Sequence, residues 1–382
     1  MIPVKKEDII KSFSMPEQRQ IETFFEFRLL AEKGYGVKKI SELLWVSVNT
    51  LNNWKYRGKM PFCVKQIQKL EKLGFLPFKL DYNDKKIRTI LKVGFFTYGD
   101  GHIARNHWKM VNLYGRHKDL EKLHRELGAL GINCHLKKEK GCSTLHIFDF
   151  VGRLLIALGF PEGDKVNSAI ALPKWLLNGS RKIKRLFLSI FFGNEGGISN
   201  EQKIRISINK TVPFLKTGVK FMRDIKKLCG EFHISTTKLT VRKCGKRKSG
   251  EETYSIRFSI TERLSVTLFY RKLNFMYADD KQTLLRNVFK NIVHDYLSKC
   301  RKRILAYENA LELRKASKSI ATIARELGIA DSTTQAWCRG TFKPDYVEKK
   351  EELSSVLNRI GENNGYPSGI RSMERPLVHL PE

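Results

Sequence analysis

The chain has 382 residues, of which 71 are Lys or Arg and 39 are Asp or Glu, giving a formal net charge of +32 at pH 7. The basic residues are spread along the whole chain, which favours a nucleic-acid-binding protein over one held to a membrane surface by a basic helix. No apolar run approaches the roughly 18 residues of a membrane-spanning helix. The seven cysteines include no Cys-x-x-Cys pair, which argues against a zinc site and a disulfide framework. We expect a cytoplasmic, nucleoid-associated protein.

Residues 1–85 are predicted to form a helix-turn-helix domain. The segment from Ile40 to Trp54 has the pattern of a helix, a tight turn and a second helix. Short polar side chains at the start of such a second helix face a DNA groove, and basic residues beyond it approach phosphates. The predicted DNA contacts are Asn49, Thr50, Asn52 and Arg57. Trp45 stands at the turn, where glycine would be the easier residue, so a plain helical hairpin is the alternative.

Residues 86–178 are predicted to form the first of two similar repeats. An apolar helical run that begins near residue 91 ends in the single carboxylate of Asp100, followed by Gly101. Further predicted elements are a helix over 117–130, a strand pair over 134–137 and 144–148, and a helix over 151–158. Phosphate contacts are predicted at the basic turn of this strand pair, through Lys137, Lys138 and Lys140.

Residues 179–290 are predicted to form the second repeat. A second apolar helical run begins near residue 187 and ends at Glu195, followed by Gly196. The elements that follow are a strand over 204–208, a helix over 219–229, a hairpin over 238–243 and 254–260, and a helix over 262–273. Predicted DNA contacts on these strands and on the basic turn of residues 245–250 are Arg205, Arg242, Lys246, Arg247, Lys248 and Arg257. The order of elements therefore repeats, although the sequence does not.

Asp100 and Glu195 are the candidate metal ligands. If the two apolar helices pack side by side, the acids at their ends come together, and paired carboxylates bind a divalent metal. We expect Mg²⁺, or Mn²⁺ in its place, and in so basic a chain the expected substrate is a phosphodiester. The alternative is that both acids are ordinary helix ends capped by glycine. An acid is unfavourable at the negative end of the helix dipole, and finding two of them favours function.

Residues 291–358 are predicted to form a second helix-turn-helix domain, and residues 359–382 a flexible tail. The segment from Ile323 to Trp337 repeats the spacing of the first unit, with Gly328 at the turn. Its predicted DNA contacts are Ser332, Thr333, Gln335 and Arg339.

At this point the sequence resembles the LAGLIDADG homing endonucleases that carry two motifs in one chain. The motifs are Leu-Lys-Val-Gly-Phe-Phe-Thr-Tyr-Gly-Asp-Gly-His-Ile at 91–103 and Phe-Leu-Ser-Ile-Phe-Phe-Gly-Asn-Glu-Gly-Gly-Ile at 187–198. Segments 158–165 and 172–178 resemble the family's connection before its second motif, and 269–285 resembles its closing helix and basic turn. The resemblance covers roughly residues 88 to 290.

The resemblance implies an α+β fold. Two pseudo-symmetric αββαββα repeats would form a saddle-shaped antiparallel sheet, flanked by all-α helix-turn-helix domains. By position, Asp100 and Glu195 would hold the metal between the two DNA strands, each serving one strand. The family also places a basic residue near each acid. Lys281 matches in the second repeat, whereas the first lacks the usual lysine and Lys165 is the nearest substitute.

The leading hypothesis is a site-specific, metal-dependent endonuclease of double-stranded DNA, of the intron-homing kind, that hydrolyses one phosphodiester on each strand. The alternative is a sequence-specific transcriptional regulator derived from such an enzyme that does not cut. Structured RNA is a further possible partner, as for an intron maturase. We expect no membrane partner, and two motifs in one chain make a monomer sufficient.

Overall fold

The computed structural model describes residues 4–105, 108–148, 150–199 and 201–354. The chain divides into two compact units, Met1–Arg286 and Asn287–Glu382. The first unit contains an N-terminal helical domain, the first predicted repeat and the second as far as Arg286. The predicted tail, residues 359–382, lies outside the described residues. Within the described part, no helix has both the length and the apolar character needed to cross a bilayer.

The first repeat follows the predicted order of elements, αββαββα. Its elements are α6 (Lys85–Phe96), β1 (Gly101–Ile103), β2 (Val111–Gly115), α7 (His117–Gly128), β3 (Cys134–Lys138), β4 (Ser143–Ile147) and α8 (Phe150–Ala157). The strands form one antiparallel sheet in the order β1-β2-β4-β3. A short helix, α9 (Lys174–Leu177), precedes the second repeat.

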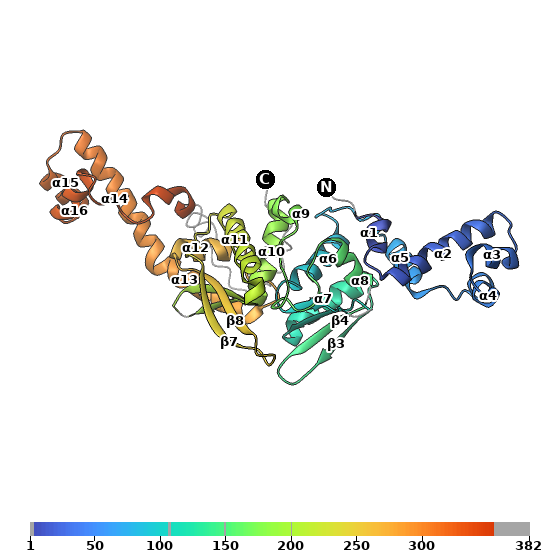
Figure 1. Cartoon of the computed structure of the whole chain (residues 1–382). Coiled ribbons are helices and arrows are strands. Elements are labelled where there is room, and N and C mark those ends of the chain that lie inside the picture. The colour runs from blue at the N-terminus through green and yellow to red at the C-terminus, as the bar shows by residue number, and fades with distance from the viewer. Residues whose placement is uncertain (1–3, 106–107, 149, 200, 355–382) are drawn as a thin grey trace. The chain divides into compact units, whose positions relative to one another are not determined.

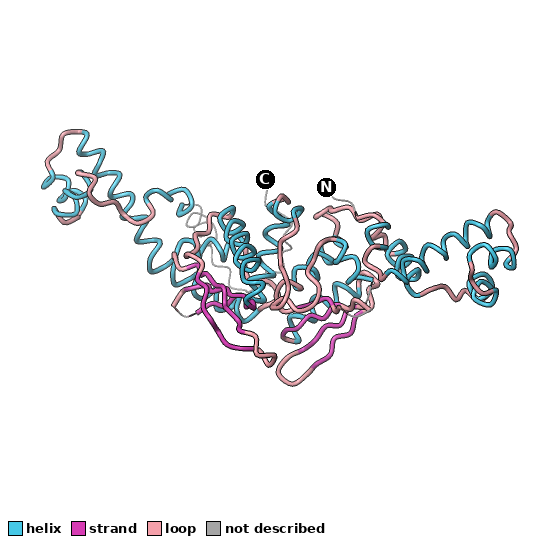
Figure 2. Tube along the Cα trace, viewed as in Figure 1, coloured by secondary structure: helices cyan, strands magenta, loops and turns pink. Residues whose placement is uncertain are grey.

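The second repeat has the same order and the same topology. Its elements are α10 (Arg181–Glu195), β5 (Gly196–Ser199), β6 (Lys203–Thr211), the 3₁₀-helix η1 (Val212–Phe214), α11 (Leu215–Glu231), β7 (Thr240–Lys246), β8 (Glu252–Ile260) and α12 (Arg263–Lys272). The sheet order is β5-β6-β8-β7, equivalent to that of the first repeat. The predicted α+β class with two similar repeats is confirmed. Both sheets lie along one side of these repeats, and the helices cover the other side (Figures 1 and 2).

Several predicted boundaries were wrong; strand β6, for example, extends to Thr211, three residues past its predicted end. Strand β7 extends to Lys246, so this residue lies in the sheet, and a turn closed by the hydrogen bond from Arg247 N to Glu251 O joins the hairpin. Helix α6 ends at Phe96, and a turn carries the chain on to Asp100. The two helices that carry the motifs, α6 and α10, pack through aromatic rings. The ring centroids of Phe95 and Phe187 lie 5.3 Å apart.

The N-terminal domain contains α1 (Lys6–Ile10), α2 (Met15–Glu32), α3 (Val37–Leu44), α4 (Val48–Tyr56) and α5 (Phe62–Lys72). The predicted helix-turn-helix is α3 and α4, with Trp54 packed on a small core of Phe27, Ile40 and Leu51. The domain docks on the first repeat through the fully buried Arg153, which donates to Ser12 O at 3.0 Å.

The second unit contains the other predicted helix-turn-helix. Its helices are α14 (Ser298–Lys315), α15 (Ile320–Leu327) and α16 (Asp331–Cys338), preceded by the end of α13 (Asp279–Ile292) and the π-helical turn η2 (Val293–Leu297), and followed by the 3₁₀ turn η3 (Val347–Lys349). Trp337 is buried against Tyr307 and Ile323. Gly328, at the turn, has a positive φ, with φ 62° and ψ 39°.

Candidate active site

The two candidate acids lie where the motif helices meet. Glu195 is the last residue of α10 and is half-buried, whereas Asp100 is exposed at the end of the turn after α6. The residue after each acid begins a strand, β1 or β5. The glycine after Glu195 is extended, with φ −83° and ψ 156°, so it is not a left-handed helix cap. Burial and the negative charge of Asp100 raise the pKa of Glu195 to about 7. The structure therefore brings both acids into one electrostatic site.

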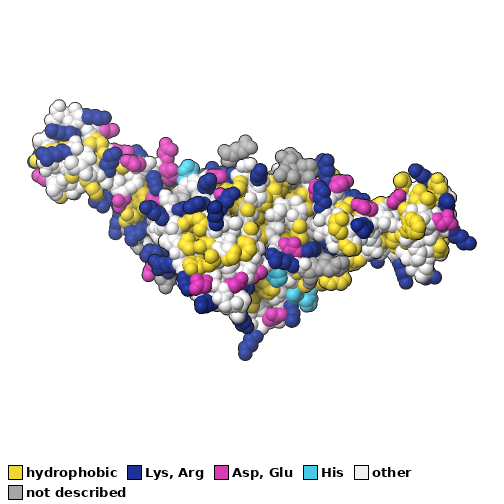
Figure 3. Space-filling model, viewed as in Figure 1, with side chains coloured by type: hydrophobic (Ala, Val, Ile, Leu, Met, Phe, Trp, Pro, Cys, Tyr) yellow, Lys and Arg dark blue, Asp and Glu magenta, His cyan; other side chains and the backbone are white. Residues whose placement is uncertain are grey.

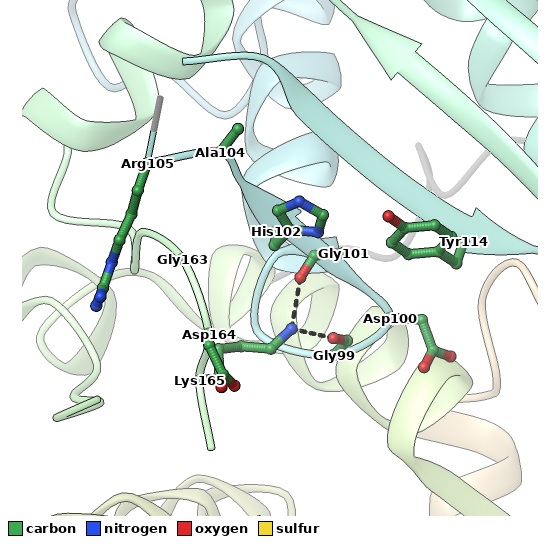
Figure 4. Close-up of a pocket in the computed structure, with 10 residues that line it drawn as sticks. All are labelled: Gly99, Asp100, Gly101, His102, Ala104, Arg105, Tyr114, Gly163, Asp164 and Lys165. Carbon is green, nitrogen blue, oxygen red and sulfur yellow. Dashed lines mark hydrogen bonds between the residues drawn. The ribbon is translucent and has the colours of Figure 1, made fainter. Parts of the chain in front are cut away.

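Lys165 lies beside the first acid. Its Nζ donates to the carbonyl oxygen of Thr97 at 3.0 Å and also to those of Gly99 and Gly101, which flank Asp100 (Figure 4). Burial lowers the pKa of Lys165 to about 8, against the opposing charges of Glu195 and Asp100. A lysine in this connecting segment was predicted only as the nearest substitute.

Lys281 occupies the equivalent place beside the second acid. It lies in the first turn of α13 rather than in a basic turn, and its Nζ donates to Gly193 O at 2.7 Å and Asn194 O at 3.0 Å. Burial lowers the pKa of Lys281, while Asp100 and Glu195 act in the opposite direction. Each lysine thus bonds the carbonyl oxygen of the residue that directly precedes an acid. The arrangement is pseudo-symmetric, because each lysine follows the last helix of its repeat, Lys165 after α8 and Lys281 after α12.

The chemistry of this donor set fits a hard divalent cation only in part. In the described residues, no group of three or more His, Cys, Asp or Glu side chains is placed to hold a metal ion. Mg²⁺ is commonly bound by one or two carboxylates together with waters and substrate phosphates. Asp100 and Glu195 are the residues that would supply those carboxylates, and a phosphate group would complete the site.

A groove of about 630 Å³ lies over the first sheet and reaches Asp100. His102, Tyr114, Arg105 and Lys165 line it (Figure 4). The rings of His102 and Tyr114 stack with centroids 5.8 Å apart. Arg105 and Tyr114 were not predicted as site residues. Tyr114 lies on β2, a strand that the sequence pattern did not delimit, so the face to which it belongs was unknown.

A second groove, of about 680 Å³, lies over the second sheet and reaches Glu195. Three predicted DNA-contacting residues line it: Arg205, Arg242 and Arg257. Strand pairing explains why they converge, because Arg242 lies opposite Ser255 and Arg257 lies opposite both Ser207 and Thr240. All three arginines are exposed. Each acid is thus continuous with a groove on the open face of its own sheet.

The predicted DNA contacts at the hairpin ends are mostly exposed. The exposed residues are Lys137, Lys138, Lys140, Lys246 and Lys248. Lys137 forms an ion pair with Glu139 at 2.9 Å, and the half-buried Arg247 forms one with Asp164 at 2.7 Å. Lys and Arg side chains occupy the lowest point of the view in Figure 3, where the β3–β4 and β7–β8 hairpins both end in Figure 1.

The helix-turn-helix residues lie on α4 and α16, except Arg57 and Arg339, which directly follow these helices. Asn49 and Arg57 are exposed, and Thr50 and Asn52 are half-buried. In the second unit, Ser332, Gln335 and Arg339 are exposed and Thr333 is half-buried.

The first turn has a regular backbone even though Trp45 stands where the second unit has Gly328. Trp45 has a φ of 54° and a ψ of 38°, which match those of Gly328, and its side chain is 94% exposed.

The chain is similar to parts of several characterised proteins. It is 28% identical over 288 residues to the tRNA-splicing ligase RtcB of Pyrococcus furiosus, covering 66% of this chain and 29% of that protein. It is 23% identical over 331 residues to the replication factor C small subunit of Methanocaldococcus jannaschii, covering 80% of this chain and 17% of that protein. The RNA polymerase subunit Rpo1N of the same organism is 27% identical over 263 residues, covering 60% of this chain and 19% of that protein. The chain spans less than a third of each relative's length. No protein-family model matches it.

The chain also resembles parts of solved structures. The homing endonuclease I-DmoI in complex with DNA and Ca has a TM-score of 0.35 and 11% identity, covering 52% of this chain and 97% of that one. Full-length DUF199/WhiA from Thermatoga maritima has a TM-score of 0.34 and 10% identity, covering 78% of this chain and 97% of that one. At these scores the likeness defines neither family nor activity.

Proposed function

We propose that this protein is a divalent-metal-dependent, site-specific endonuclease of double-stranded DNA that hydrolyses one phosphodiester on each strand. The observation that carries the proposal is the close contact of Gly99 with Asn194, the residues directly before Asp100 and Glu195, together with one lysine and one groove for each acid. Two equivalent half-sites are what a reaction on two antiparallel strands requires.

The residues of the chain have distinct parts in this proposal. Asp100 and Glu195 would hold Mg²⁺ or Mn²⁺, which would supply activation of a water and stabilisation of the leaving oxygen. Lys165 and Lys281 place positive charge beside the acids, where negative charge develops during hydrolysis. Arg205, Arg242, Arg257 and the hairpin lysines position the duplex by contacting phosphates, and base edges are read from the open faces of the sheets. The two helix-turn-helix units extend the contact with DNA.

The comparisons support an inserted element rather than the activity of any relative. The chain resembles minor parts of three proteins whose names share no activity. A segment common to such proteins is better explained as an element carried within them than as a part of ligation, replication or transcription. An endonuclease that cuts a defined site is the activity that would spread such an element.

The test is cleavage of a randomised duplex library by the purified chain, with Mg²⁺ and, separately, with Ca²⁺. We expect staggered double-strand cuts at one recovered sequence with Mg²⁺, lost in an Asp100→Asn/Glu195→Gln variant. Glu22→Gln, an equal chemical change at an exposed residue of α2, is the matched control and should cut normally. Retention of one sequence by both proteins without cutting under either metal would instead identify a DNA-binding regulator.

A further inference from the structure

Strand β6 ends in a residue that breaks its own pattern. Its inward-facing positions are Ile204, Ile206, Ile208 and Lys210, and all four side chains are buried. A fourth aliphatic residue would complete the apolar row. Its place is taken by Lys210, which is only 1% exposed. Burial lowers the pKa of Lys210 to about 8. A buried ammonium group is costly unless its hydrogen bonds are satisfied, so a residue of this kind indicates a specific task.

The structure makes room for this side chain. Gly218 of α11 faces it, and a Cβ atom at that glycine would lie 2.6 Å from Lys210 Cγ and 2.7 Å from Ile256 Cδ1. Any larger residue at position 218 would displace the lysine stem. The glycine and the lysine therefore form a matched pair in the core of the second repeat.

The Lys210 ammonium bonds the segment that carries Lys165. Among the described residues, both of its hydrogen-bond acceptors are backbone carbonyl oxygens, those of Lys165 and of Ser168, the latter at 2.8 Å. The next residue of β6 continues the attachment, because Thr211 N donates to Val166 O at 3.2 Å. This segment belongs to an irregular connection between α8 and α9, so its path depends on such attachments.

The attachment crosses from one repeat to the other. Lys210 belongs to the second repeat, whereas Lys165 bonds the carbonyl groups around Asp100 in the first. The segment that carries Lys281 is held in the opposite direction, by a residue of the first repeat. Buried Asp119, in α7 of the first repeat, accepts from the backbone N of Asp279 at 3.3 Å, two residues before Lys281.

We propose that Lys210 is a positioning residue that sets the place of Lys165 beside Asp100, and so controls cleavage of the strand that Asp100 serves. The inference rests on the proposed endonuclease function. It predicts an asymmetric defect, because Lys281 is held by other residues. It assigns no contact with DNA to Lys210, whose side chain faces away from the open surface of the sheet.

The first experiment uses Lys210→Met, which keeps an unbranched stem as far as Cε and removes the ammonium group. The recovered duplex carries a different fluorophore on each strand, and single Asp100→Asn and Glu195→Gln variants define which strand each acid serves. We expect Lys210→Met to slow the Asp100 strand at least tenfold and the Glu195 strand less than twofold. Equal rates on both strands, slowed or not, would overturn the proposal. Ile208→Ala, at the neighbouring inward position, is the control for loss of packing and should slow neither strand selectively.

The second experiment does not need cleavage. Brief acetylation with acetic anhydride, read by mass spectrometry, measures the reactivity of each lysine in the full chain. We expect Lys165 to react at least threefold faster in Lys210→Met, with Lys281 unchanged and with no such change in Ile208→Ala. Unchanged reactivity of Lys165 would overturn the proposal even if the wild-type protein cuts DNA. If the wild-type protein cuts nothing, the proposed function fails, and the reactivity of Lys165 alone decides whether Lys210 positions it.

Discussion

Gly99 and Asn194 meet where the two motif helices end. A Cβ atom at residue 99 would lie 2.6 Å from Asn194 Cβ and 2.9 Å from its Nδ2. Because residue 99 directly precedes one acid and residue 194 directly precedes the other, this contact fixes how closely Asp100 and Glu195 approach. The absence of a side chain at Gly99 is therefore a condition for the site.

Gly99→Ala should separate the helix ends and weaken the protein. Added volume in a well-packed contact costs about 1–3 kcal/mol of unfolding free energy, and cleavage should fall further because the acids move apart. Chemical denaturation and strand-resolved cleavage measure the two effects. Gly230→Ala, in α11 on the helical side, is the control, since a Cβ there would meet nothing within 4 Å. If Gly99→Ala matches Gly230→Ala in both measurements, the close approach of the two helices is not required.

Replacement of Glu195 by Gln should stabilise the protein, and only at higher pH. A carboxyl group whose pKa is raised on folding contributes stability below its unfolded pKa, and that contribution is lost as pH rises through the folded value, here about 7. The variant should therefore equal the wild type near the unfolded pKa and exceed it above pH 7 by on the order of 2 kcal/mol. Thermal or denaturant unfolding across this range measures the difference. A constant difference at all pH values would show that Glu195 titrates normally.

Mg²⁺ should raise the unfolding temperature of the wild type but not that of a variant without the two carboxylates. Ligand that binds only the folded state raises the unfolding temperature, and this metal requires the ionised carboxylates. We expect Mg²⁺ to stabilise the wild type at pH 8 and to leave Asp100→Asn/Glu195→Gln unchanged. An equal shift in both proteins would place the metal elsewhere.

Much of this architecture was predictable because it repeats. Two apolar helices ending in acids, and helices and hairpins in the same order after each, indicated the αββαββα repeats. The lysine positions were less accessible. Lys281 was located only by family resemblance, and Lys165 lies in an irregular connection whose path is fixed by Lys210, 45 residues away. Lys210 itself lay beyond the predicted end of its strand, because a lysine ended the alternating apolar pattern. The short strands β1 and β5 contain too few residues for any alternation to show.

Trp45 and Gly328 should respond in opposite directions to substitution. A left-handed conformation costs a non-glycine residue roughly 1 kcal/mol, and the indole of Trp45 is too exposed to recover this by packing. Trp45→Gly should therefore stabilise α3 and α4 by about 0.5–1 kcal/mol, reduced by the greater entropy of an unfolded glycine. Gly328→Ala should destabilise α15 and α16 by about 1 kcal/mol. Amide hydrogen exchange in each pair of helices measures the local effect. Loss of protection in Trp45→Gly would contradict the strain argument.

Removal of the three groove arginines should reduce both the affinity for DNA and its dependence on salt. Each phosphate contact releases counterions, so substituting Arg205, Arg242 and Arg257 by Ala should lower the slope of log affinity against log salt by up to about 3. Binding of a fluorescent duplex between about 50 and 200 mM salt measures this slope. The control removes equal charge from the helical side, through Lys216→Ala, Lys220→Ala and Lys227→Ala on exposed positions of α11. If both triple variants lose the same slope, attraction by net charge explains the binding. A loss confined to the arginine variant would place the DNA backbone in the groove that leads to Glu195.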